Sequence, residues 1–338
     1  MQSPLFGDTE TTSTKPAKKS GKSIESAIYD PALVELANSL PAHLRLGTSS
    51  WSYPGWDGLV WNGEYAPTNL SRYGLPAYAQ HPLFRTVSID RNFYRPMNVA
   101  QFAEHAAQVG QDFRFVVKAP SLVTDALVRD ESGRGMRQNP NFLDAEQAVK
   151  MFVEPALEGL GHKLGPLVFQ ISPLPTAWLG QMPKLIDRLH ALLAAVPDLK
   201  TTAPDAVVAV EVRDPQWLTQ QFLDALRATG ATYCMGLHAK MPRIAEQLPI
   251  LRALWPRPLV CRWNLNPVHG AYGYEEAEGI YSPYDKIIDP DPETRAALAR
   301  VIAGTAGAGQ NVFVTLSNQA EGCAPLSVIE LVRALQKN

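Results

Sequence analysis

Residues 206–236, AVVAVEVRDPQWLTQQFLDALRATGATYCMG, contain the pattern that decides the fold. An apolar, β-branched run at 206–212 is followed by a helical pattern at 218–228 and a second strand-like run at 232–236. Gly230 stands where a helix C-cap is expected. Two strands joined through a helix run parallel, because the chain has to cross back over the sheet before it pairs again.

The same alternation extends over most of the chain. Further strand-like runs lie at residues 44–49, 85–90, 113–118, 167–171, 259–263 and 311–316. Helical patterns lie at 99–109, 145–160, 183–196, 294–303 and 326–335, with Gly110 and Gly304 as further candidate C-caps. About eight strand–helix units close a barrel, so the sequence predicts an α/β fold with a single (β/α)8 TIM-type barrel.

A doubly wound open sheet is the main alternative to the barrel. Gly47-Thr48-Ser49-Ser50, which follows the first strand, lacks the second and third glycines of a dinucleotide-binding turn. Residues 123–141 and 264–289 are predicted to be long loops over the C-terminal mouth of the barrel. We predict a disordered polar and basic tail at residues 1–26 and a barrel domain at 27–338.

Composition excludes several classes of protein. The chain has 338 residues, 46% of them hydrophobic, and a formal net charge of −2, so no global positive field attracts nucleic acid or an anionic membrane. No apolar run approaches the roughly 20 residues of a membrane span. Cys234, Cys261 and Cys323 have neither disulfide-framework nor metal-ligand spacing, which fits a reducing environment. We therefore predict a soluble, cytoplasmic protein without a membrane partner.

Polar side chains stand at the ends of many predicted strands, and active sites of (β/α)8 barrels lie at the C-terminal strand ends. The predicted catalytic residues are Asp90, Glu211 and Lys118. The predicted ligand-binding residues are Thr48, Ser49, Trp51, Asn92, Tyr94, Gln170, Arg213, Arg262 and Asn318. We expect the charged members and Gln170 to point into one cavity, with Trp51 and Tyr94 on its wall.

A salt-bridged plug is the alternative interpretation of these charges. In it, Glu211 pairs with Arg262 or Lys118 pairs with Asp90, and the barrel is simply closed by a polar layer. Within the site interpretation we also expect Glu211 to pair with Arg213 or Arg262. Such pairing lowers the pKa of Glu211 and makes it a residue that orients the ligand.

The usual signatures of nucleophilic, metal and phosphate-loop chemistry are missing from the sequence. No serine lies in a Gly-x-Ser-x-Gly elbow, and no Walker loop is present. The seven histidines lack the spacing of a paired metal site, so we predict neither a metal nor a cofactor.

An ordered set of motifs resembles the YecE-like family, a domain of unknown function with a TIM-barrel fold. The motifs are Gly47-Thr48-Ser49-x-Trp51-x-Tyr53-x-x-Trp56, Asn92-Phe93-Tyr94, Phe113-x-Phe115-x-x-Lys118, Lys163-Leu164-Gly165-Pro166-Leu167-x-Phe169-Gln170 and Glu211-x-Arg213-x-x-x-Trp217. The resemblance implies the fold and no particular reaction. Ser88 stands where the family usually has an acid, and the nearest carboxylate is Asp90. The late polar motifs are reduced to Ser317-Asn318 and Ser327.

Three functions fit these observations. The first is an enzyme, or former enzyme, that acts by carboxylate acid/base chemistry on a small anionic, ring-bearing metabolite such as a sugar phosphate or nucleotide fragment. The second is a module that binds nucleotides or single-stranded nucleic acid on rim aromatics, which the nearly neutral charge disfavours. The third is a non-catalytic scaffold barrel.

Overall fold

The computed structural model of the protein describes residues 23–130 and 134–337. Parallel strands close a barrel in the order β1-β10-β9-β8-β7-β6-β3-β2. They are β1 (Leu44–Thr48), β2 (Phe84–Ile89), β3 (Arg114–Lys118), β6 (Leu164–Gln170), β7 (Val207–Glu211), β8 (Thr232–Leu237), β9 (Leu259–Trp263) and β10 (Val312–Leu316). The predicted (β/α)8 barrel is confirmed, and the closed order rules out the open doubly wound sheet.

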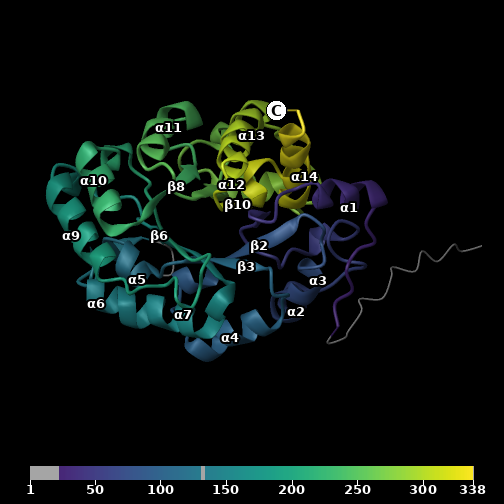
Figure 1. Ribbon diagram of the computed structural model, residues 1–338, viewed down its shortest axis with the longest axis horizontal. Coiled ribbons are helices and arrows are strands. Elements are labelled where there is room, and N and C mark those ends of the chain that lie inside the picture. Colours follow the sequence, from purple (N-terminus) through teal and green to yellow (C-terminus); the bar gives the residue numbers. More distant parts are fainter. Residues whose placement is uncertain (1–22, 131–133, 338) are drawn as a thin grey trace, which may run out of the picture.

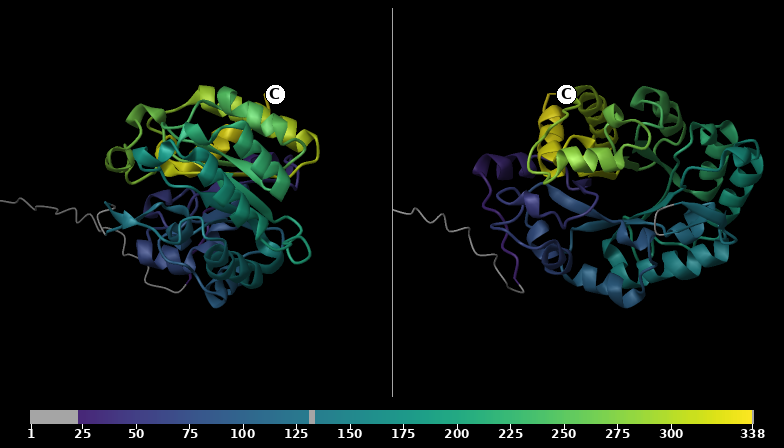
Figure 2. Two further views of the ribbon diagram at one scale, coloured as in Figure 1. Left: turned by 90° about the vertical axis from the view of Figure 1, so that its left-hand side faces the viewer. Right: turned by 180° about the vertical axis from the view of Figure 1, so that it is seen from behind.

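Helices form a ring around the strands (Figures 1 and 2). The longer ones are α4 (Val99–Ala107), α7 (Glu154–Leu160), α9 (Met182–Ala194), α10 (Gln220–Thr229), α11 (Ile244–Ala253), α13 (Pro292–Gly307) and α14 (Ala324–Leu335). The short α6 (Ala145–Ala148) runs through one π-helical stretch, Val149–Val153, into α7. Each of the longer helices buries apolar side chains, and these side chains form the helix face that covers the barrel.

The remaining elements lie before β2 or in the loops after strands. Three helices, α1 (Pro31–Asn38), α2 (Pro67–Tyr73) and α3 (Leu75–Tyr78), precede β2. The predicted loop at 123–141 contains the hairpin of β4 (Leu127–Arg129) and β5 (Gly135–Gln138), next to α5 (Ser121–Thr124). The short α8 (Thr176–Leu179) follows β6, and α12 (Tyr274–Tyr281) lies in the predicted loop at 264–289. These two loops are therefore partly regular structure.

The beginning of the barrel domain differs from the prediction. Residues 1–22 of the predicted tail lie outside the described residues. Within 23–26, however, Ile24 is buried in the core and Ser26 forms a β-bridge with Trp61. Burial of the Ile24 side chain removes apolar surface from water and favours an ordered segment here, so the folded part starts before the predicted boundary at residue 27.

Alternation along the strands sends every second side chain into the barrel. One apolar layer of the interior consists of Val116, Val168, Val207, Ala209, Cys234, Val260 and Phe313. Towards the N-terminal ends of the strands, Asp205 accepts from Arg45 at 2.8 Å and from Arg114 at 2.9 Å. The interior is thus filled across its width, as in other barrels of this type.

Some helix boundaries were predicted wrongly. Gly230 does cap α10, in the left-handed region at φ 76°, but Gly304 lies inside α13 and Gly110 lies beyond the cap of α4 at Gln108. Helix α11 was not predicted at all. It contains Pro249, and few of its side chains are fully buried, so its apolar pattern is weak. None of the helices in the described ranges has the length and apolar character needed to cross a bilayer.

Candidate functional site at the barrel mouth

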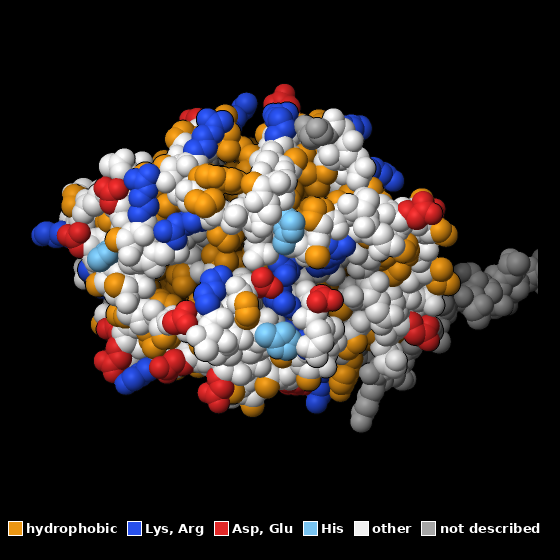
Figure 3. Space-filling view, viewed as in Figure 1, with side chains coloured by type: hydrophobic (Ala, Val, Ile, Leu, Met, Phe, Trp, Pro, Cys, Tyr) orange, Lys and Arg blue, Asp and Glu red, His pale blue; other side chains and the backbone are white. Residues whose placement is uncertain are grey.

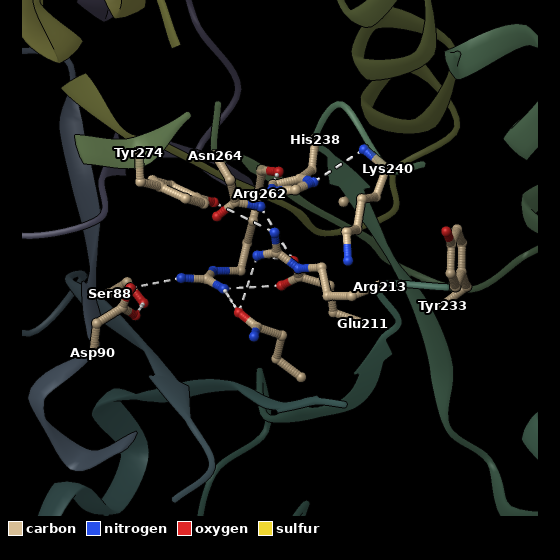
Figure 4. Close-up of polar contacts among 12 residues, drawn as sticks. Ser88, Asp90, Glu211, Arg213, Tyr233, His238, Lys240, Arg262, Asn264 and Tyr274 are labelled. Atoms are coloured by element: carbon tan, nitrogen blue, oxygen red, sulfur yellow. Dashed lines mark hydrogen bonds and ion pairs between the residues drawn. The ribbon is translucent and has the colours of Figure 1, made fainter. Parts of the chain in front are cut away.

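A layer of polar side chains lies directly above the apolar layer, at the C-terminal ends of the strands (Figure 4). Four of its members follow an inward apolar residue by two positions: Lys118 follows Val116, Gln170 follows Val168, Glu211 follows Ala209 and Arg262 follows Val260. Lys and Arg side chains lie beside Asp and Glu near the middle of the face seen in Figure 3. The strand period therefore determines which polar residues meet here.

Glu211 is the centre of this layer. Its side chain is completely buried, and Oε1 accepts from Arg213 Nη2 at 2.8 Å and from Asn264 Nδ2 at 3.1 Å. Oε2 accepts from Arg262 Nη1 at 2.8 Å. Burial opposes ionisation, but Arg213 and Arg262 outweigh it and hold the pKa of Glu211 below its ordinary value. Glu211 is thus in the paired, charged form expected from the sequence.

Arg262 extends the network across the barrel to β2. Its Nη2 donates to Asp90 Oδ2 at 2.6 Å, and its Nη1 also donates to Gln170 Oε1 at 3.0 Å. Arg213 Nη2 donates to the same Gln170 oxygen at 3.1 Å. The predicted pair of Glu211 with Arg262 is present, so the layer does close the barrel interior as the plug interpretation expects. The guanidinium of Arg262 is buried and already bound on both Nη atoms.

Asp90 is the carboxylate of this layer that solvent reaches. Its side chain is 30% exposed, whereas Arg262 is only 2% exposed. Ser88 Oγ donates to Asp90 Oδ1 at 2.5 Å, so the serine found in place of the family's usual acid now supports the carboxylate beside it. Both oxygens of Asp90 therefore have a donor, and the group still faces the mouth.

Lys118 is the exception in the layer, because its charge lies against an aromatic ring instead of a polar partner. Within the described residues its Nζ forms no hydrogen bond or ion pair, and it lies 3.6 Å from the centre of the Phe93 ring. The predicted alternative pair with Asp90 is absent from that part of the chain. Burial, together with the nearby Arg262 and Arg213, lowers the pKa of Lys118 to about 7, against the opposing effect of Asp90 and Glu211.

Two residues outside the predicted set complete the mouth. Tyr274 accepts a long, 3.4 Å hydrogen bond from Arg213 Nη1, and its ring packs on His238 with centroids 5.5 Å apart. Burial, and then Arg213, lower the pKa of His238 to about 4. Tyr274 lies in the loop predicted at 264–289, and no spacing in the sequence connects it with His238 at the end of β8. Tyr274 comes from α12, so only the fold brings it to β7.

Several predicted binding residues form hydrogen bonds within the loops and turns after the strands instead of contacting the charged layer. Thr48 Oγ1 bonds Tyr78 and the carbonyl of Ser50. Asn92 donates to the carbonyl of Lys118 at 2.8 Å, and Asn318 accepts from the indole of Trp56 and from the backbone of Ala324. Polar residues at strand ends also hold the turns that follow, and the sequence does not distinguish these two uses.

The predicted aromatic wall is divided between core and surface. Trp51 is 6% exposed and packs edge-on against His105, at a centroid distance of 5.5 Å. Tyr94 is 83% exposed, next to Phe93. Ser49 is half-buried, and its hydroxyl has no hydrogen-bond partner in the described ranges. Of the two predicted wall residues, Tyr94 is the one with ring surface available to a ligand.

Neither of two clefts beside α11 and α13 coincides with the predicted site. Two clefts of about 490 and 620 Å³ lie between α11 and α13, on the outside of the barrel. The larger includes His238, but neither is lined by Asp90, Lys118 or Glu211. The charged residues thus converge on one another rather than on these clefts. No group of three His, Cys, Asp or Glu side chains within the described ranges is arranged to hold a metal ion.

Comparison with known proteins identifies the family. A family model described as "Protein of unknown function DUF72" matches residues 45–338. The chain belongs to the DUF72 family. This confirms the YecE-like resemblance seen in the motifs. No curated protein is similar enough to this chain to match it.

Solved structures of DUF72 proteins share the fold. A DUF72 protein of Enterococcus faecalis V583, solved at 3.10 Å, is 18% identical with a TM-score of 0.57, over 87% of this chain and 95% of that chain. One from Thermotoga maritima MSB8, solved at 2.20 Å, is 20% identical with a TM-score of 0.53, over 87% of this chain and 99% of that chain. At these identities the similarity shows the fold alone.

Proposed function

We propose that this DUF72 protein is an enzyme that binds a small, anionic, ring-bearing metabolite at the C-terminal mouth of its barrel and transfers a proton there. The observation that carries the proposal is the unequal pairing within the charged layer. Glu211 and Arg262 are buried and bound to each other, whereas Lys118 is half-buried and has no polar partner in the described residues. A layer that only closed the barrel has no need of this unpaired charge.

The anionic group of the ligand is assigned to Lys118 and Arg213. Nη2 of Arg213 donates to Glu211 and Gln170. In the described residues, Nη1 makes only the long, 3.4 Å contact with the Tyr274 hydroxyl. A phosphate or carboxylate oxygen is a stronger acceptor than a tyrosine hydroxyl, and it would replace that contact. Arg262 was also a predicted anion ligand, but its two Nη atoms are taken, so we assign it the role of holding Asp90 in place.

Proton transfer is assigned to Asp90 rather than to Glu211. Asp90 is partly exposed at the mouth, and a general base has to reach the proton that it removes. Glu211 is buried beneath the arginines and kept ionised by them, so it positions Arg213 and Arg262. The ring of the ligand is assigned to the exposed face of Tyr94.

A screen of small metabolites by thermal shift tests the proposal. Sugar phosphates and nucleotide fragments at 100 times their dissociation constant should stabilise the protein by about 2.7 kcal/mol. Calorimetry on a hit should then show weaker binding in Arg213→Lys, because lysine keeps the charge and loses the fork of donors. Arg333→Lys, at the exposed end of α14 and outside both clefts, is the matched control. Unchanged affinity in Arg213→Lys would place the anion elsewhere.

Exposed aromatic side chains favour one second candidate, a nucleotide or single-stranded nucleic-acid binding module. Tyr94 and Tyr272 are both 83% exposed, and Lys240 Nζ donates to the Tyr272 hydroxyl at 2.8 Å. Bases stack on such rings without sequence preference. Binding of a short oligonucleotide that weakens steeply with salt, in the absence of any metabolite hit, would favour this module over the enzyme.

A further inference from the structure

Lys118 differs from the other lysines whose contacts the structure gives. Lys163 Nζ donates to the carbonyls of Ala106 and Val109 at 2.7 and 2.8 Å. Lys150 forms an ion pair with Glu146. Lys118 Nζ has neither kind of contact among the described residues, although it lies in the most highly charged part of the barrel. Its amine is therefore not occupied by the fold.

Burial and neighbouring positive charges in the surroundings of Lys118 favour a neutral lysine. The side chain is half-buried at the end of β3, and the Phe93 ring, 3.6 Å from Nζ, is a contact that favours its charged form. Burial, with smaller contributions from the guanidinium groups of Arg262 on β9 and Arg213 after β7, lowers its pKa to about 7. At pH 7 about half of the Lys118 side chains are then the free amine, about a thousandfold more than for an ordinary lysine.

We propose that Lys118 is the nucleophile of this site and forms an imine with the carbonyl carbon of an anionic aldehyde or ketone. This deepens the function proposed above and rests on it. Lys118 then bonds the carbonyl carbon instead of contacting the anionic group, and Arg213 holds that group. Lysines use this chemistry where desolvation or a neighbouring cation keeps the amine neutral. The substrate class thereby narrows from anionic metabolites in general to those that carry a carbonyl group.

The step balances with the groups at hand. The lone pair of Lys118 Nζ attacks the carbonyl carbon, and the π electrons of the carbonyl move onto its oxygen. One proton passes from nitrogen to that oxygen, which gives a carbinolamine. The hydroxyl then leaves with the second nitrogen proton as one water molecule, and a C=N bond remains. Asp90, on the neighbouring strand β2, is the carboxylate placed to carry these protons.

Reductive trapping with pyridoxal 5′-phosphate tests the inference on the full chain. This probe is an aldehyde with a ring and a phosphate group, and borohydride converts its imine into a stable amine. Peptide mapping should find Lys118 labelled at least about tenfold faster at pH 7 than Lys150, whose side chain is 63% exposed and whose pKa is raised by the hydrogen bond from its amine to Glu146. Pyridoxal, which lacks the phosphate, is the matched probe and should label Lys118 more slowly.

The outcomes separate the two proposals. Labelling spread over surface lysines, with Lys118 unmodified, would overturn the nucleophile even if the thermal-shift screen finds an anionic ligand. Fast labelling of Lys118 at the same rate by both probes, with no anionic ligand in the screen, would overturn the anion site and leave the amine reactive. Lys118→Met should lose the fast-labelled peptide while its circular dichroism stays that of the wild type. If the fast-labelled peptide persists in this variant, the label lies on another residue and the inference fails.

Discussion

Replacing Glu211 by glutamine tests whether one carboxylate holds the charged layer together. The substitution keeps the shape of the side chain and removes the charge that accepts from Arg213 and Arg262, each at 2.8 Å. Arg262 retains Asp90, but Arg213 has no second ion pair in the described residues. Removing one partner of a buried ion pair costs about 3–5 kcal/mol. With one of the two guanidinium groups still paired, we expect a loss of about 3 kcal/mol in the free energy of unfolding.

Urea unfolding at pH 7, followed by tryptophan fluorescence, measures this change in the free energy of unfolding. Glu146→Gln is the control, because its ion pair with Lys150 lies on the surface with both side chains mostly exposed. It should change stability by less than about 1 kcal/mol. The double variant Glu211→Gln, Arg213→Met should recover part of the loss, since it removes the unpaired charge as well. A loss below about 1 kcal/mol in Glu211→Gln alone would refute the reasoning.

Three further predictions concern pH and packing. The pKa of Lys118 is lowered to about 7, so its charged form opposes folding at neutral pH. In parallel unfolding series of the wild type and Lys118→Met, the stability of the wild type relative to the variant should increase as the pH rises from 7 to about 10. A flat difference would contradict the shift. The pKa of His238 is lowered to about 4, so the free energy of unfolding should fall as the pH drops from about 6.5 towards 4. His238→Gln should show a smaller decrease over this pH range. An NMR titration of the His238 ring with a midpoint above 6 would contradict this prediction. Gly47→Ala would place a Cβ against the Thr86 carbonyl oxygen, and thermal unfolding should show a stability loss of about 1–3 kcal/mol or more. Gly110→Ala is the control, because the added Cβ meets no atom within 4 Å. Equal effects of the two substitutions would mean that β1 and β2 can separate freely.

The barrel was predictable because its strands are buried on both faces. Runs such as 206–210 are apolar throughout and stand out against the helical patterns between them. Helix α11 escaped prediction because its interior proline and half-buried apolar residues give no clear stripe. Gly304 was taken for a cap because glycine is common at helix ends, whereas α13 simply continues through it. Local signals failed where the surrounding packing decided the outcome.

The site was only partly predictable from the sequence, for a different physical reason. Two-residue alternation puts Asp90, Lys118 and Glu211 in one layer, because strand geometry fixes the direction of each side chain. It does not tell which charges pair, so the alternatives of a ligand site and a plug both remained. Tyr274 reaches Arg213 from an insertion, which no strand period describes. Asn92 and Asn318 have the same position as site residues but spend their amides on the turns that follow.

The filled interior below the charged layer has a kinetic consequence. The apolar layer around Ala209 and Phe313, and the ion pairs of Asp205 beyond it, leave the mouth with a floor instead of a second opening. A molecule that reaches Asp90 has to depart by the route through which it came. Product that dissociates slowly therefore blocks the route by which the next substrate enters the mouth. For any single-substrate reaction carried out here, steady-state inhibition by product should be competitive, and a long dwell time of product would set the turnover rate.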